Sequence, residues 1–333
     1  MSGRMDNVTH TMSGLILAQM GLGAGSRAGT VALVVSSNLP DVDVFVQMAG
    51  HFQRDHIFSH RGITHGLALI PLEAAIVSTS IWALTCWRSH ASPALSWGKL
   101  TLLSLLGLLS HLALDFANEY GVRMLAPFNN SWYSSDLTGL LDFWLLTTLS
   151  LGFILPMLFR GRTSNHFPAH VAICCLGVVI AYVGVKYFSH ERAVARLEEI
   201  APPSESVRIA CFPGSLSPFV WKGVIEDGKR TELLEVSVSG RPPIRRQQFE
   251  NACPENVRAA SMHSPEVRAL LSFARFPHFT AEPWTTASGG RGYKVHLTDL
   301  RWQSSKGYNY GPQVKLWLNE RLASVKEEVI PWG

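Results

Sequence analysis

The chain has 333 residues, of which 47% are hydrophobic and only 16% are charged, and its net charge is +4. Because globular proteins usually contain roughly 25% charged residues, this composition indicates a membrane-embedded part. Lys and Arg are dispersed along the chain, so nucleic-acid binding is not indicated. The apolar residues concentrate before residue 190. We therefore expect a membrane domain over residues 1–190 and a soluble domain over residues 200–333.

The first apolar stretch, residues 9–37, is predicted to form a helical hairpin and not a single span. Residues 21–29 read Gly-Leu-Gly-Ala-Gly-Ser-Arg-Ala-Gly, which breaks a helix. Two helices of about ten residues remain, whereas a spanning helix needs roughly 20. A hairpin also returns the chain to its starting side, where His10 and Asp41 can meet. A site shared by these two residues therefore requires the hairpin.

Four later stretches are each apolar and long enough to be predicted as spanning helices. They cover residues 66–87, 100–117, 137–159 and 168–188. This topology places loops 38–65 and 118–136 on the same side as the C-terminal domain. The short loops on the opposite side contain Arg88, Lys99, Arg160 and Arg162. By a small margin, the positive-inside rule then places the first side outside the cytoplasm, with a chain that crosses the membrane several times.

The part after residue 190 has a different pattern. A charged helical stretch and an Ala-Pro-Pro hinge at 201–203 lead into short alternating segments that are typical of antiparallel strands. The predicted strands are 207–210, 219–221, 234–238, 293–297 and 314–318, and the predicted helix is 264–273. The expected fold is an α-helical membrane bundle of about four spanning helices plus an N-terminal hairpin, followed by a soluble β-rich α+β domain.

The five cysteines do not form the pattern of a disulfide framework. Cys86, Cys174 and Cys175 lie in apolar stretches, where cysteine usually serves packing. Cys211 and Cys253 lie in the soluble part and could pair if that part is extracytoplasmic. The sequence leaves this pairing open.

Four short motifs carry histidine and aspartate next to apolar stretches. They are residues 5–10, ending in His10; Leu-Pro-Asp-Val-Asp at 39–43; His-Arg-Gly-Ile-Thr-His at 60–65; and His-Leu-Ala-Leu-Asp at 111–115. Ionisable groups beside lipid are costly and usually functional, and imidazole with carboxylate is a common ligand set for catalytic divalent metals. We predict that one or two divalent ions, with zinc expected, are bound. The predicted ligands are His10, Asp41, His60, His65, His111 and Asp115.

Each motif alone also has a plainer interpretation. His111 and Asp115 share a helix face and could be a buried structural pair, and Pro40-Asp41 could begin a solvated turn. The metal site is favoured because unrelated histidines and aspartates are not expected to gather by chance at the same membrane face. Within the set, Asp43 is predicted to act as a base. Arg61, a planar donor, is predicted to stabilise developing negative charge.

The four motifs, in this order and spacing, resemble those of the YdjM-like family, whose members are described as inner-membrane, LexA-binding, metal-dependent hydrolases. The resemblance covers about residues 1–190. Segments 217–221 and 298–302 resemble the longer members. Gly66 departs from the serine expected after the second histidine of its motif. The resemblance implies an inner-membrane hydrolase and, through the family description alone, a LexA-type partner.

The ligand order His, Asp, His and then His-x-x-x-Asp is also similar to that of zinc-dependent phospholipase C, which hydrolyses phosphodiesters. Further downstream ligands of that enzyme have no counterpart here, which favours one or two ions over three. The expected function is a membrane-bound hydrolase acting on a phosphoester or lipid-like substrate through metal-activated water. The alternative is a non-enzymatic metal-binding sensor or interaction protein. A transporter is disfavoured, because the polar residues lie at helix ends.

Overall fold

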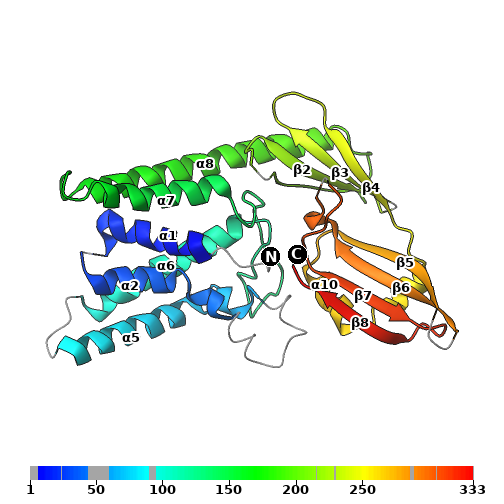
Figure 1. The fold of residues 1–333 in the computed structure, drawn as a ribbon, viewed down its shortest axis with the longest axis horizontal. Coiled ribbons are helices and arrows are strands. Elements are labelled where there is room, and N and C mark those ends of the chain that lie inside the picture. Colours follow the sequence, from blue (N-terminus) through cyan, green and yellow to red (C-terminus); the bar gives the residue numbers. More distant parts are fainter. Residues whose placement is uncertain are drawn as a thin grey trace.

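The computed structural model describes residues 7–23, 25–43, 60–89, 95–214, 216–228, 230–285, 289–304 and 306–332. Most of its helices lie at one end, and its strands lie at the other end together with the short helix of residues 265–273 (Figure 1).

The N-terminal hairpin is confirmed. Helix α1 (Asn7–Leu17) continues into a short π-helix (Ala18–Leu22), and α2 (Arg27–Ser36) packs back against α1. The chain reverses where Gly21 and Gly25 have φ angles of 93° and 65°, a backbone conformation that glycine adopts at no steric cost.

Three described helices are long and apolar enough to cross a membrane: α5 (Ile70–Ser89), α6 (Trp97–Ala117) and α8 (Phe167–Glu198). They correspond to the predicted spans 66–87, 100–117 and 168–188. The remaining predicted span, 137–159, contains a helix of only 16 residues, α7 (Phe143–Leu158). This helix starts late because the side chain of Asp142 accepts a hydrogen bond from the backbone N–H of Leu145 and so caps it.

The C-terminal part contains, in the described residues, two four-stranded antiparallel sheets. The first has the order β1 (Arg208–Pro213), β2 (Val220–Glu226), β3 (Arg230–Ser237), β4 (Ile244–Glu250), and the second β5 (Pro277–Thr285), β6 (Arg291–Asp299), β7 (Gln313–Leu318), β8 (Ser324–Ile330). Helices α9 (Glu255–Ser261) and α10 (Pro265–Phe273) join them. The five predicted strands and the predicted helix are confirmed. The prediction missed β4, β5 and β8.

Each sheet has one core that includes residues from the helical part, and the first sheet also packs its other face against Phe276 and Leu300. The end of α8 supplies Ala193 and Leu197 to the core of the first sheet, which also contains Cys211. Tyr120, from the loop after α6, belongs to the core of the second sheet, against which Cys253 packs. Both cysteines are free. The possible Cys211–Cys253 pair is therefore not formed, because the two thiols lie in different cores.

The proposed division between residues 190 and 200 stays a prediction. Helix α8 continues beyond residue 190, ends at Glu198 and reaches the first sheet (Figure 1).

Candidate metal centre

Three separate stretches of chain bring four potential ligands to one point. Asp41 lies on a 3-10 turn (Leu39–Val42) after α2, His65 on a second one (Ile63–His65) before α5, and His111 and Asp115 on the last turns of α6. One ligand atom from each of the four lies within 4.8 Å of the others. All four side chains are buried, with at most 2% exposure.

The closest atoms are ring nitrogens and carboxylate oxygens. The Nε2 atoms of His65 and His111 are 3.2 Å apart, and Asp115 Oδ2 lies 3.3 and 3.2 Å from them. Asp41 Oδ1 lies 3.4 Å from His65 Nε2 and 3.7 Å from His111 Nε2. Two imidazoles and two carboxylates therefore face a common centre.

His10 and His60 flank this group on opposite carboxylates. His10 Nε2 is 3.5 Å from Asp115 Oδ1, and the His10 ring stacks on that of His111 with centroids 3.9 Å apart. His60 Nε2 is 3.8 Å from Asp41 Oδ1. The structure thus brings together all six residues that the sequence suggested as ligands. Which of them ligate an ion stays a prediction.

The orientation of His111 follows from the close packing of α6 against the end of α2. A Cβ atom at Gly107, one turn before His111, would lie 2.7 Å from the Leu33 carbonyl oxygen, so only glycine permits this approach. The approach puts His111 Nδ1 2.9 Å from the backbone carbonyl oxygen of Ser37. A carbonyl can only accept, so Nδ1 carries the proton and Nε2 presents a lone pair to the centre.

Asp43 orients His60 and His65 so that they, like His111, turn Nε2 toward the centre. The Asp43 carboxylate accepts a hydrogen bond from His60 Nδ1 at 2.9 Å and from the Thr64 hydroxyl at 3.1 Å. Since that hydroxyl proton is already donated, Thr64 Oγ1 accepts from His65 Nδ1 at 3.0 Å. Both rings therefore also direct an Nε2 lone pair inward.

The donor set fits a divalent cation. Imidazole lone pairs and carboxylate oxygens face each other inside the protein, and Asp41 Oδ2 and His60 Nε2 have no hydrogen-bond partner among the described residues. Burial opposes ionisation of Asp41 and His65, yet their mutual hydrogen bond and neighbouring charges lower the pKa of Asp41 to about 2 and raise that of His65 to about 9. This cluster thus favours positive charge at its centre, which a proton or a nitrogen- and oxygen-binding metal can supply.

Arg61 is bound into the same cluster. Its Nη2 lies 2.7 Å from Asp115 Oδ1, its Nη1 donates to the Gly121 carbonyl at 3.3 Å, and its guanidinium lies 4.7 Å from the centre of the Tyr120 ring. Arg61 also has a φ of 60°, a strained conformation for a residue with a side chain. Its backbone N–H donates to Asp43. The catalytic roles of Asp43 and Arg61 stay predictions.

Arg301 of the C-terminal part holds the loop that Arg61 contacts, a role that the sequence analysis missed. This buried side chain pairs with Asp299 at 3.0 Å and donates to the carbonyls of Glu119, at 3.0 Å, and Tyr120, at 3.3 Å. No local pattern predicts a contact across some 180 residues. Thr64 was also missed, although its place between the two histidines of its motif was a signal.

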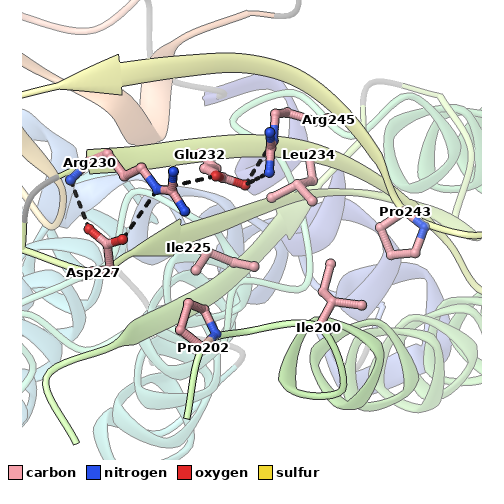
Figure 2. A pocket seen from close by; sticks show the side chains of 9 residues that line it. All are labelled: Ile200, Pro202, Ile225, Asp227, Arg230, Glu232, Leu234, Pro243 and Arg245. Carbon is pink, nitrogen blue, oxygen red and sulfur yellow. Dashed lines mark hydrogen bonds and ion pairs between the residues drawn. The ribbon is translucent and has the colours of Figure 1, made fainter. Parts of the chain in front are cut away.

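A separate pocket of about 250 Å³ lies in the first sheet, beside the end of α8 (Figure 2). Its charged side chains pair with one another: Arg230 with Asp227 at 3.3 Å and with Glu232 at 3.5 Å, and Arg245 with Glu232 at 2.8 Å. The pocket shares no residue with the centre, and its paired charges leave no group that suggests a ligand.

Apolar helices that can cross a bilayer, with a buried histidine–aspartate cluster at their ends, define a membrane protein with a candidate metal centre. The model of the family described as "YdjM inner membrane protein" matches residues 5–193, and the chain belongs to this family. The predicted family is thus confirmed. The chain is also similar to the uncharacterized protein YfhP of Bacillus subtilis (strain 168), with 24% identity over 316 residues, covering 92% of this chain and 89% of the relative. No solved structure matches.

Proposed function

We propose that the protein is a metal-dependent hydrolase of the inner membrane that acts on a phosphoester or lipid-like substrate. The observation that carries this proposal is the buried group of Asp41, His65, His111 and Asp115, with ligand atoms within 4.8 Å of one another. When bound there, a divalent cation lowers the pKa of coordinated water toward neutrality and polarises the ester to be cleaved. Zinc suits this mixture of imidazole and carboxylate ligands.

The residues around this group have distinct roles in the proposal. His60 and His10, next to Asp41 and Asp115, complete the ligand shell or hold a second ion. Asp43 fixes the imidazole of His60 through Nδ1, as carboxylates commonly do for metal-binding histidines. Arg61 balances the charge of Asp115 and places a cation beside the centre, where a phosphoryl oxygen can bind.

The proposal includes a membrane orientation. In it the chain crosses the membrane several times, and the positive-inside rule favours a position outside the cytoplasm for the side that carries the four motifs. The centre, at the ends of the apolar helices, would then meet lipid head groups from that side.

Metal analysis and a hydrolysis assay on the same purified samples test the proposal. The wild-type protein in nanodiscs should contain one or two zinc ions per chain and cleave a chromogenic phosphodiester. Chelation should abolish cleavage, and zinc should restore it. His65→Gln should lose metal and activity together. His278→Gln, which changes a buried histidine of β5 outside the cluster, is the matched control and should keep both.

A metal sensor is the second candidate, and the burial of the four ligands favours it. Four protein ligands can close a tetrahedral site and leave no position for water, as in structural zinc sites. X-ray absorption on the zinc-loaded protein separates the candidates. Four ligands from the protein alone, without phosphodiesterase activity, support the sensor, whereas a coordinated water supports the hydrolase. Protein that binds no stoichiometric metal contradicts both.

A further inference from the structure

An exposed apolar patch joins the start of α7 to the turn between β1 and β2. It consists of Leu141, Phe143, Trp144, Leu216 and Phe219. All five are large apolar residues, and each is between 48% and 66% exposed. An apolar patch of this kind usually marks an interaction surface.

Hydrogen bonds fix the turn against two helices. The Trp144 indole N–H donates to the carbonyl of Leu216 at 2.7 Å, which ties the turn to α7. The Ser189 hydroxyl donates to the carbonyl of Pro218 at 2.6 Å and accepts from the Trp221 indole at 2.8 Å, which ties it to α8. The position of the patch relative to both helices is therefore set by the fold.

The patch continues the apolar surface of these helices. On α8, Ile173, Ile180 and Phe188 are more than half exposed, as are Met157 and Leu158 on α7. At 1.5 Å per residue, the stretch from Phe167 to Phe188 is about 32 Å long, close to the roughly 30 Å of a bilayer's hydrocarbon core. Ser189, the next residue, is the one that holds the turn. The patch therefore lies at the level where α8 leaves the hydrocarbon.

We propose that Leu216 and Phe219 insert into the boundary between lipid head groups and acyl chains, so that the first sheet rests on the bilayer surface beside α7 and α8. Trp144 suits this depth, since tryptophan is enriched at membrane interfaces. The continuity with the lipid-facing helices favours lipid over a protein partner as the occupant. The inference is independent of the metal centre.

Photo-cross-linking tests the proposal. The full chain is prepared with p-benzoylphenylalanine in place of Phe219, reconstituted in phospholipid nanodiscs, irradiated and analysed by intact mass spectrometry. The matched control carries the same group in place of Val325, an exposed apolar residue of β8. The expected result is a mass increase of one phospholipid at position 219 and none at position 325.

Three results would overturn the proposal: no adduct at position 219, an adduct only with a second protein chain, or equal lipid labelling at both positions. Misfolding of the labelled protein is controlled with Leu216→Ser, a small change at an exposed site. In nanodiscs it should reduce lipid labelling at position 219 severalfold, while the thermal midpoint in detergent stays at the wild-type value. An unchanged labelling yield in this variant would also count against insertion.

Discussion

Replacing Asp41 and Asp115 by asparagine, one at a time, should separate the role of metal ligand from that of ion-pair partner. Both changes keep the side-chain volume and remove a carboxylate from the group of four. Only Asp115 also pairs with the buried Arg61, at 2.7 Å. Both variants should lose metal, and both should lose stability without metal, because Asp41 also pairs with His65 at 3.4 Å. The loss of stability should be larger for Asp115→Asn, which leaves the permanently charged Arg61 unpaired.

The size of the ion-pair effect can be worked out from the geometry. Two unit charges 2.7 Å apart attract by about 6 kcal/mol at an effective dielectric constant of about 20. Desolvation cancels part of this, and removal of one partner of a buried pair typically costs ~3–5 kcal/mol because the other charge is left unpaired. Arg61→Met should therefore recover stability in the Asp115→Asn background, with a coupling energy of about 3 kcal/mol, but not in the Asp41→Asn background.

The assay is unfolding in mixed detergent micelles after chelation, combined with metal determination on untreated samples. Asp136→Asn is the matched control, because Asp136 pairs with Arg275 at 2.6 Å outside the group of four. It should lower stability without changing metal content. A coupling energy between Arg61 and Asp115 below about 0.5 kcal/mol, or wild-type metal content in Asp115→Asn, would refute the reasoning.

Three further predictions concern the surroundings of the centre. Thr64→Val removes the hydroxyl that orients His65 and should weaken zinc binding by about 10–100-fold in calorimetry, whereas Thr64→Ser should retain wild-type affinity. Arg301→Ala should lower the free energy of unfolding by ~3–5 kcal/mol and also weaken zinc binding, because it releases the loop that Arg61 contacts. Burial raises the pKa of Glu119 to about 7, so the folded state holds a proton that the unfolded state releases near pH 4.5. Stability should therefore fall as pH rises from about 4.5 to 7, and Glu119→Gln should flatten this part of the stability profile.

Each of these predictions has a result that contradicts it. Equal zinc affinities for Thr64→Val and wild type would mean that the hydroxyl does not set the ring of His65. Loss of stability in Arg301→Ala with unchanged zinc affinity would mean that the loop at Tyr120 does not link the C-terminal part to the metal centre. An unaltered pH profile in Glu119→Gln would assign the titration to another group.

The features that the sequence predicted are those with a local pattern. The glycines of 21–29 predicted the hairpin, and the spacing of four predicted that His111 and Asp115 share a face. The four histidine and aspartate motifs could be assigned to one site because all of them were predicted to lie at the same membrane face. The strands that were predicted contain alternating or β-branched apolar residues, as β7 shows most clearly with its regular alternation of buried and partly buried positions.

The features that were missed depend on contacts between distant segments or on exposed positions. Strands β4, β5 and β8 each lie at the edge of a sheet, where exposed polar residues or prolines hide the alternation. The late start of α7 depends on one capping carboxylate, Asp142. The contact between Arg301 and the loop at Tyr120 forms only in the folded chain, so no sequence window contains both.

The continuous helix α8 constrains the order in which the chain can assemble. Its last turns, with Ala193 and Leu197, complete the core of the first sheet, and Tyr120 completes the core of the second. Both contributions come from segments that leave the ribosome before the strands do. The helical residues that these two cores require are therefore already synthesised when the sheets begin to fold, and helices that have entered the bilayer offer the C-terminal part a surface on which to complete its cores.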